Sequence, residues 1–252
     1  MQNFIKIFLA ASILLLAGSS FAKEFKCNWG HYNPEPYIIL DKKTSKPESG
    51  IIVDICNSIA KELGLKVKMV NTPRKRADQF CLDGTTDIII TANKAWLPTL
   101  KDQPWLPVFY KVKHKFVFTE KKKQLAEKEI KELDGLTIAT TLGFNYHEKS
   151  LNDKIESGSI KRFDVKSEAE AIKMLVSERL HVAIVEEITS NYFLKMDYSS
   201  TILTYSKKTL SSADITPVLC GKPDKDSTEK ISKIADKLIA SGKIKKILNK
   251  YR

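Results

Sequence analysis

The 252-residue sequence lacks several motifs that carry enzyme chemistry. It contains no GxSxG nucleophile motif, no HExxH zinc motif and no glycine-rich phosphate loop. Its four cysteines show no CxxC or Cys/His spacing, and it has only four histidines. These absences argue against a hydrolase, a nucleotide-binding enzyme and a metal site. We therefore expect a protein that is not an enzyme and carries no cofactor.

Long hydrophobic runs are absent beyond residue 22. Residues 1–22 contain one basic residue, Lys6, an apolar run over 7–17, and small residues at both positions that signal peptidase reads. This pattern is typical of a secretory signal peptide, because the run is too short to span a bilayer as an uncleaved anchor. Ser19 stands where a lipoprotein would carry its lipidated cysteine, so no lipid anchor is expected. The mature chain is expected to be soluble and exported.

Negative charge is the scarcer sign, with 30 acidic against 42 basic residues and a net charge of +12. Such a balance ordinarily suggests nucleic acid or an anionic membrane surface as a partner, but export argues against nucleic acid. The excess lies on residues 111–131, which carry +5, and 222–252, which carry +6. Residues 23–110 and 132–221 carry +3 and −3 and nearly cancel. The positive charge therefore says little about a ligand.

The cysteines form an even set in an exported chain, which predicts two disulfides. Four cysteines allow three connectivities. We favour Cys56 with Cys81, because each lies in a helical pattern early in the chain, and Cys27 with Cys220. The alternative is that Cys27 and Cys220 are buried free thiols.

The apolar pattern alternates between strand and helix periodicity along the whole mature chain. In the first half we expect strands at 24–29, 65–70 and 87–91, with helices opening at Gly50 and after Pro73. In the second half we expect strands at 115–119, 136–141, 160–165, 182–185, 202–205 and 215–220, and helices at 143–151, after Ser167, at 188–196 and from Asp226. The order strand, helix, strand predicts parallel sheets with right-handed crossovers. The sequence therefore predicts two α/β lobes in series.

Short strings in a fixed order resemble a known family. They are the strand and aromatic-Pro-Tyr segment at 28–37, Gly-Ile-x-x-Asp at 50–54, Lys-Glu-Leu-Gly-Leu at 61–65, Gly-x-x-Asp at 84–87, Phe-Tyr at 109–110, Leu-Asp-Gly-x-x-Ile-Ala at 133–139 and a C-terminal Ala-Ser-Gly-Lys-Ile segment. Their order and spacing resemble the extracellular solute-binding proteins of the amino-acid-binding family. These have the type II periplasmic binding protein fold and serve ABC importers.

The resemblance implies a two-lobed α/β fold, each lobe a mainly parallel sheet flanked by helices. Lobe 1 would be 23–114 plus 221–252, lobe 2 would be 120–215, and two crossing hinge strands would be 115–119 and 216–220. It implies a periplasmic monomer that captures a small polar, amino-acid-like or amine-bearing ligand for an ABC permease. The alternatives are a ligand-sensing module for a chemoreceptor or sensor kinase, and a dehydratase-like enzyme on the same fold.

In such folds the ligand lies beyond the carboxyl ends of the strands. After the first strand, Trp29, His31 and Tyr32 offer aromatic surface for a planar or cationic ligand. Trp29 is equally well explained as a core residue. A lone His31 does not predict a metal site, because no second ligand stands at a suitable spacing.

After the third strand, the resemblance implies an Arg that clamps an α-carboxylate, but Thr99 stands at that position. The neighbourhood offers Thr91, Lys94 and Trp96 as ligand-binding candidates. Lysine supplies charge without the planar fork of arginine. Arg74 could replace the clamp, whereas Arg76 is better explained as a solvated charge.

Two further candidates lie in the second half. The turn that leads from a strand towards a helix contains the candidates Thr141, Gly143, Phe144 and Asn145. Its backbone N–H groups could bind an anion at a helix N-terminus, or the segment is only a tight turn. Glu186 ends a buried strand where the resemblance implies an acid that binds an α-ammonium group; Glu187 is expected to point elsewhere.

Overall fold

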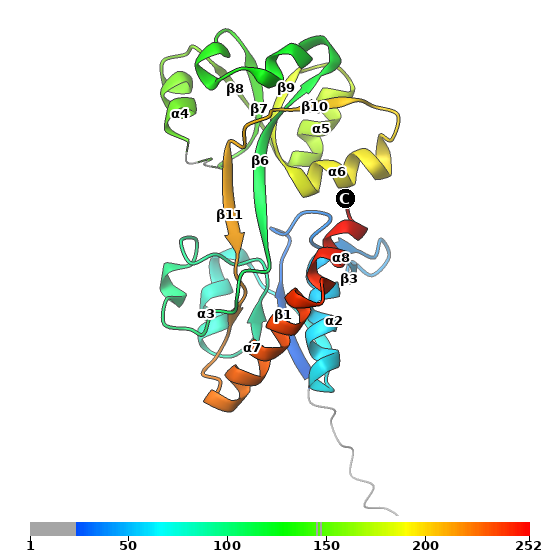
Figure 1. The fold of residues 1–252 in the computed structure, drawn as a ribbon, viewed down its shortest axis with the longest axis vertical. Coiled ribbons are helices and arrows are strands. Elements are labelled where there is room, and N and C mark those ends of the chain that lie inside the picture. The colour runs from blue at the N-terminus through cyan, green and yellow to red at the C-terminus, as the bar shows by residue number, and fades with distance from the viewer. Residues whose placement is uncertain (1–23, 145, 147) are drawn as a thin grey trace, which may run out of the picture.

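The computed structural model describes residues 24–144, 146 and 148–252. The expected signal peptide and Asn145 lie outside the described residues. The described chain forms two α/β lobes, which two neighbouring strands join (Figure 1). Within these residues no helix combines the length and apolar character needed to cross a membrane.

The first lobe is built on a sheet with the strand order β12-β5-β1-β4. Its strands are β1 (Glu24–Trp29), β4 (Lys66–Asn71), β5 (Ile88–Ile89) and β12 (Val218–Leu219). β1 runs parallel to both β4 and β5, as the alternation of strands and helices predicts. β12, from the far end of the chain, pairs antiparallel with β5.

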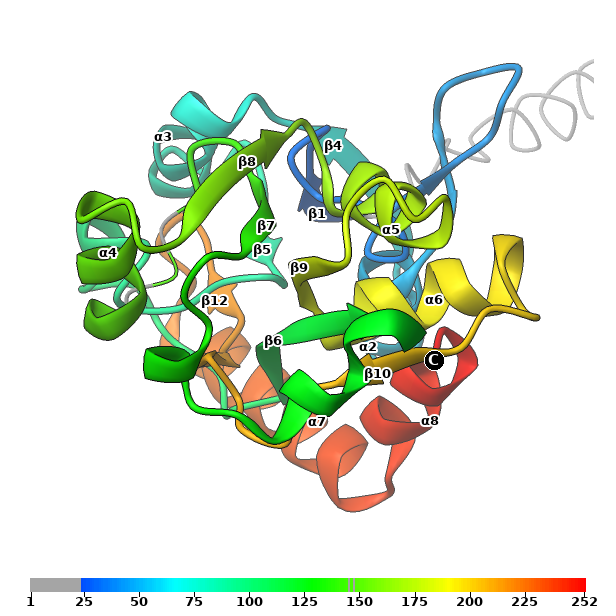
Figure 2. The ribbon, with the colours of Figure 1, turned by 90° about the horizontal axis from the view of Figure 1, so that it is seen from above.

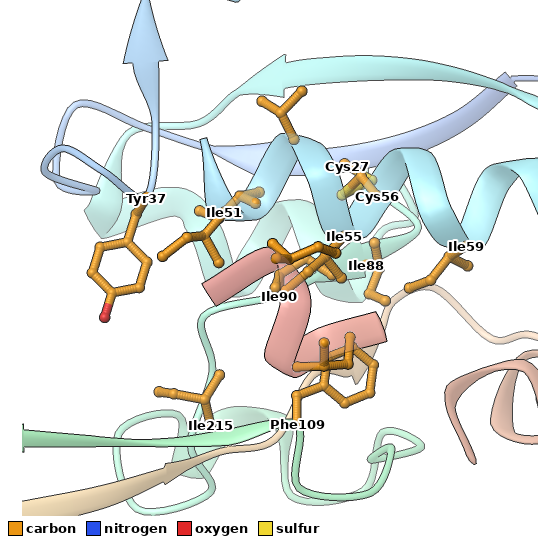
Figure 3. Close-up of a cluster of buried hydrophobic side chains, with 14 of the residues drawn as sticks. Cys27, Tyr37, Ile51, Ile55, Cys56, Ile59, Ile88, Ile90, Phe109 and Ile215 are labelled. Atoms are coloured by element: carbon orange, nitrogen blue, oxygen red, sulfur yellow. A yellow bond between two sulfur atoms is a disulfide. The ribbon is translucent and has the colours of Figure 1, made fainter. Parts of the chain in front are cut away.

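Helices cover the first-lobe sheet, and the apolar face of one of them builds its core. The helices are α2 (Ile51–Leu63), α3 (Ala77–Leu82), α7 (Lys225–Ala240) and α8 (Lys243–Lys250), with the 3₁₀ turns η1 (Arg74–Arg76) and η2 (Pro98–Leu100) and a hairpin of β2 (Ile39–Leu40) and β3 (Pro47–Ser49). Ile51, Ile55 and Ile59 recur at helical spacing, are fully buried and pack in a cluster with Ile88 (Figure 3). Gly50 precedes α2 with φ +125°, and a Cβ there would lie 2.6 Å from the Tyr37 carbonyl oxygen, so glycine is required.

The second lobe is built on a mixed sheet with the order β10-β6-β9-β7-β8. Its strands are β6 (Tyr110–Thr119), β7 (Thr137–Thr141), β8 (Lys161–Val165), β9 (Val182–Glu186) and β10 (Leu203–Tyr205); its helices are α4 (Lys149–Glu156), α5 (Glu168–Val176) and α6 (Glu187–Asp197), with the 3₁₀ turns η3 (Glu120–Glu127) and η4 (Ile130–Glu132). β7 is parallel to β8 and β9, whereas β6 is antiparallel to β9 and β10. Figure 2 shows α4 and α5 on opposite sides of β7.

β6 and β11 (Ser211–Ile215) run between the lobes, and the expected hinge boundaries shift accordingly (Figure 1). The two strands pair antiparallel over Tyr110–His114 and Ser211–Ile215. Residues 115–119, expected as a hinge strand, pair instead with β9 and β10, and 216–220 contain β12 of the first sheet. The sequence analysis did not extend the strand over the first half of β6, although buried residues alternate there with exposed lysines, as in an antiparallel strand with one solvated face.

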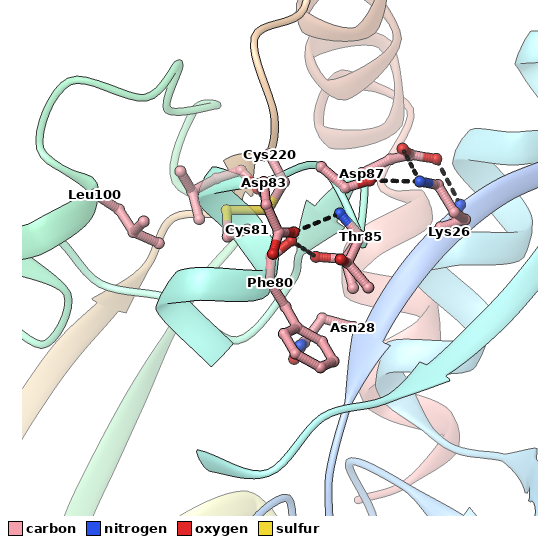
Figure 4. Close-up of a disulfide and its surroundings, with 12 residues drawn as sticks. Lys26, Asn28, Phe80, Cys81, Asp83, Thr85, Asp87, Leu100 and Cys220 are labelled. Carbon is pink, nitrogen blue, oxygen red and sulfur yellow. Dashed lines mark hydrogen bonds and ion pairs between the residues drawn. A yellow bond between two sulfur atoms is a disulfide. The ribbon is translucent and has the colours of Figure 1, made fainter. Parts of the chain in front are cut away.

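The structure contains two disulfides, but the favoured pairing is wrong. Cys27 bonds to Cys56, and Cys81 bonds to Cys220 (Figure 4). Cys27 on β1 faces Cys56 on α2 within one buried cluster, whereas Cys81 and Cys220 belong to another. Helix periodicity places Cys56 and Cys81 on buried faces but does not say which element each face meets.

Three local expectations also change. The helix expected from Gly143 begins at Lys149, and the strand β11 was not expected. The helix expected from Asp226 is α7, which is capped by Asp224 and not by Asp226: the Asp224 carboxylate accepts a hydrogen bond from the Ser227 N–H at 2.7 Å.

Candidate ligand-binding site

A cavity of about 820 Å³ is lined by residues of both lobes and of the two connecting strands. This volume is in the range of small-molecule binding sites. The lining includes Tyr32, Tyr37, Arg74, Thr91 and Trp96 of the first lobe, Val112, His114, Ser211 and Ala213 of the connecting strands, and Gly143, Phe144, Tyr146, Glu168, Glu186 and Thr189 of the second. Tyr32, Thr91 and Glu186 stand at or just beyond the carboxyl ends of β1, β5 and β9. This is the edge where ligands bind in such sheets.

Most of the expected site residues line this cavity. They are Tyr32, Arg74, Thr91, Trp96, Gly143, Phe144 and Glu186. Trp29, His31, Lys94 and Thr141 are not among the described lining residues. Trp29 is a core residue with 4% of its surface exposed, and the His31 ring lies against its edge. The Lys94 ammonium lies 5.9 Å from the ring of Trp105.

The turn after β7 contributes side chains to the cavity but is not a helix N-terminus. The Phe144 N–H donates to the Thr141 carbonyl at 3.0 Å, which closes a turn. α4 begins five residues later, at Lys149, and its cap is the carboxylate of Glu148, which accepts from the Ser150 N–H. The expectation that a helix dipole aids anion binding at 141–145 is therefore wrong.

Glu186 combines burial with several hydrogen bonds. It caps α6, where Oε1 accepts from the Ile188 N–H at 3.0 Å and Oε2 accepts from the Thr189 N–H at 2.9 Å. The Tyr37 hydroxyl donates to Oε2 at 3.3 Å. Burial raises the pKa of Glu186 despite these bonds. Among the described residues only Ile188 donates to Oε1, so this oxygen retains a lone pair for a ligand.

Glu168, the first residue of α5, is a cavity residue that the sequence analysis did not identify. Its Oε2 atom is buried, and no described residue donates a hydrogen bond to it. Burial, and next the negative charge of Glu186, raise the pKa of Glu168 to about 8. The sequence pattern explains this residue as part of a helix start, since the Ser167 hydroxyl caps α5. Its place just beyond the carboxyl end of β8 was the available signal.

His114 was also not identified from the sequence. It lies on β6 opposite Glu186 in the β6–β9 register, and its Nε2 atom is 3.7 Å from Oε1 of Glu168. Burial lowers the pKa of His114 to about 4, so the ring is neutral at neutral pH. The aromatic rings of Phe144 and Tyr146 lie 4.9 and 5.7 Å from its centre.

The first-lobe side of the cavity carries the opposite charge. The Arg74 guanidinium lies 6.0 Å from the centre of the Tyr32 ring, and one of its nitrogens is 3.4 Å from a carboxylate oxygen of Asp78. The Tyr32 hydroxyl donates to the Asn28 side chain at 2.8 Å, which fixes the ring. Burial raises the pKa of Tyr32, so this hydroxyl stays protonated.

The arrangement suits a small ligand with groups of both charges. Carboxyl groups of the second lobe can bind a cationic group, and the guanidinium of the first lobe can bind an anionic one. Trp96 and Phe144, from different lobes, remain 42% and 39% exposed although both line the cavity. Their rings offer apolar surface that a ligand can cover.

Similar solved structures share the fold. An ancestral cationic amino acid solute-binding protein matches with a TM-score of 0.72 and 16% identity, covering 90% of this chain and 95% of the other. A putative ABC transporter binding component from Wolinella succinogenes DSM 1740, complexed with lysine, matches with 0.69 and 18% over the same shares. The L-cystine solute receptor of Neisseria gonorrhoeae, unliganded and open, matches with 0.67 and 16%, covering 90% and 92%.

A comparison with curated proteins finds no match. The model of one protein family matches residues 30–252, which is nearly the whole described chain. The chain therefore belongs to the bacterial extracellular solute-binding proteins, family 3.

Proposed function

We propose that this protein binds an amino acid or a similar amine-bearing solute between its lobes in the periplasm and delivers it to an ABC importer. The observation that carries this proposal is the cavity itself. Residues of both lobes line it, with Glu186 on one lobe and Arg74 on the other.

The two charged groups match the two ends of an amino acid. A guanidinium can bind a carboxylate through two parallel hydrogen bonds, and a carboxylate accepts strong hydrogen bonds from an ammonium group. The family position for the clamping arginine holds Thr99, which lies outside the cavity lining. Arg74 is the arginine among the described lining residues, so we assign the carboxylate to it.

Closure of the lobes would provide the mechanism of capture. A ligand that contacts both lobes at once binds the closed state more tightly and shifts the population towards it. The strands β6 and β11 form the connection about which the lobes would move. Trp96 and Phe144 would then lose exposed surface.

The similar structures support this ligand class. One was solved with lysine, another is an ancestral arginine-binding protein bound to arginine, and a third is an L-cystine receptor. The expected signal peptide supports the periplasm, and the family supports an importer as the partner. We further propose that the protein acts as a monomer.

A thermal-shift screen tests the proposal. The panel contains the proteinogenic amino acids, polyamines and small organic acids, added to the purified mature chain. A ligand at 100 times its Kd should stabilise the protein by about 2.7 kcal/mol. A blank result across the panel would refute the proposed ligand class.

A ligand identified in the screen also serves to test whether the protein changes its ligand chemically. One similar structure is an ancestral amino-acid-binding protein described as a precursor of cyclohexadienyl dehydratase. We expect a solute released by denaturing the complex to be chemically unchanged in its NMR spectrum. Conversion of the bound solute would instead assign an enzymatic role.

A further inference from the structure

Glu168 and Glu186 form a carboxyl pair that no described cation neutralises. Both line the cavity, and both approach His114, Glu186 through strand register and Glu168 at 3.7 Å. His114 is the only described basic side chain within 4 Å of Glu168, and burial keeps its ring neutral. Two neighbouring buried carboxyl groups cannot both ionise cheaply without a counter-ion.

We propose that Glu168 is a second ligand-binding carboxylate beside Glu186, and that the site selects a ligand of net positive charge and binds it with loss of a proton from Glu168. This inference rests on the proposed function, because it names the ligand class of that same cavity. The proton passes from the Glu168 carboxyl group to the solvent, and the ligand cation replaces it. No other bond changes.

The surroundings of Glu168 support a proton on the empty site. The titratable or charged groups on the neighbouring elements include Glu186 on β9, His114 and Tyr110 on β6, Tyr37 of the first lobe, Tyr146 after β7, Glu187 on α6, and Asp164 and Arg162 on β8. Lys111 and Lys113, which alternate with the buried residues of β6, are exposed. Arg162 is paired with Asp164 at 2.7 Å. Burial raises the pKa of Tyr37, Tyr110 and Tyr146, so these groups stay neutral. With a pKa of about 8, Glu168 holds its proton at neutral pH in the empty site.

The buried Oε2 atom of Glu168 lacks a hydrogen-bond donor among the described residues. A buried polar atom without a partner is costly. A ligand ammonium or guanidinium group would supply donors to this atom and to the free lone pair on Oε1 of Glu186. Such a cation also favours the ionised form of both carboxyl groups, so the Glu168 proton leaves as the ligand binds.

The charges lining the cavity determine the ligand charge. Once Glu168 is ionised, two carboxylates face one guanidinium, and Arg74 is already partly offset by Asp78 at 3.4 Å. Glu186 and Arg74 alone balance a zwitterion, so Glu168 would keep its proton beside such a ligand, and an ionised Glu168 would leave the closed site negative. A ligand with two cationic groups and one carboxylate, such as a basic amino acid, balances it.

Calorimetry with L-arginine and L-citrulline tests the inference, since the two have nearly the same shape but differ by one charge. We expect L-arginine to bind about tenfold to a hundredfold more tightly. In phosphate and Tris buffers near pH 7, the binding heats should differ by an amount that corresponds to release of about one proton. Between pH 6 and 7.5 the affinity should rise about tenfold per pH unit.

The matched variants are Glu168→Gln and Glu170→Gln. Both replace a carboxyl group with an amide in the first turn of α5, but Glu170 does not line the cavity. We expect Glu168→Gln to abolish proton release and most of the preference for L-arginine over L-citrulline, and Glu170→Gln to retain both.

Three results would overturn the inference: equal binding of the two probes, binding of L-arginine without proton release, or no binding of L-arginine at millimolar concentration. A neutral or acidic ligand found in the thermal-shift screen would overturn it too, but would leave the proposed solute-binding function intact.

Discussion

The Tyr37 hydroxyl donates a hydrogen bond to Oε2 of Glu186 at 3.3 Å, across 149 residues of sequence. Tyr37 belongs to the first lobe and Glu186 caps α6 of the second, so this buried bond joins the lobes within the cavity. The Glu186 carboxylate therefore caps α6 and accepts a hydrogen bond from the first lobe, and its Oε1 atom can still accept a hydrogen bond from a ligand.

Tyr37→Phe should weaken the contact between the lobes. The change removes one buried hydrogen bond to a carboxylate and leaves the ring, so the free energy of unfolding should fall by about 1–2 kcal/mol. Urea denaturation measures this change. Tyr198→Phe, at the end of α6, is the control and should have little effect. A stability equal to that of the wild type would mean that the contact between the lobes contributes nothing.

Arg74→Gln should weaken binding of any ligand that carries a carboxylate. A lost hydrogen bond between charged groups is worth about 1.5–3 kcal/mol, which corresponds to about tenfold to a hundredfold in Kd. The control is Arg76→Gln in the same 3₁₀ turn, because the Arg76 guanidinium lies over the Phe80 ring and does not line the cavity. Calorimetry with the best amino acid from the screen compares the two. An equal loss in both variants would contradict the assignment of Arg74.

The sequence allowed prediction of those site residues that lie at the ends of strands. Tyr32, Thr91 and Glu186 each follow a strong strand pattern, and parallel sheets place such positions at one edge. The family resemblance added the expectation of an acid at Glu186. Both sources depend on local pattern and order along the chain, which the fold preserves.

Glu168 and His114 could not be identified in this way. Glu168 is the first residue of α5, and the helix dipole alone explains an acidic residue there. His114 alternates with lysines on β6, so the sequence does not show that its face turns into the cavity. Their proximity depends on how α5 packs on β9 and β6, which is a tertiary relationship.

The disulfides illustrate the same limit and give a direct test. Non-reducing proteolysis followed by mass spectrometry should recover Cys27 linked to Cys56 and Cys81 linked to Cys220. A peptide that links Cys56 to Cys81 would contradict the structure.

Removal of either disulfide should reduce stability. The Cys81–Cys220 bond spans 139 residues and the Cys27–Cys56 bond spans 29, so the longer loop constrains the unfolded chain more. We expect paired Cys→Ser substitutions to cost about 5 kcal/mol at Cys81 and Cys220 and about 3.5 kcal/mol at Cys27 and Cys56. Urea denaturation of the two variants measures the difference. A smaller loss for the 139-residue loop would argue that the entropy of the unfolded chain does not dominate.

Glu168 and His114 should give stability opposite dependences on pH. The pKa of Glu168 is raised from 4.5 to about 8, so unfolding releases its proton and stability falls as the pH rises through this range. The pKa of His114 is lowered from 6.5 to about 4, so the unfolded chain takes up a proton and stability rises with pH up to about 6.5. The two effects oppose each other below pH 6.5. Between 6.5 and 8 the contribution of His114 is complete, and stability depends on the buried carboxyl groups, Glu168 and also Glu186, whose pKa burial raises as well.

The ligand-free protein should therefore lose stability between pH 6.5 and 8, and the proton of Glu168 contributes a slope of at most about 1.4 kcal/mol per pH unit. Urea denaturation at several pH values across this window measures the slope. In Glu168→Gln the slope should become shallower by up to this amount, because the amide does not titrate, so the stability of the variant relative to the wild type should increase towards pH 8. Glu170→Gln should keep the wild-type slope. A flat wild-type profile would show that Glu168 is ionised in the empty site, and the buried carboxyl pair would then need a counter-ion that the described residues do not supply.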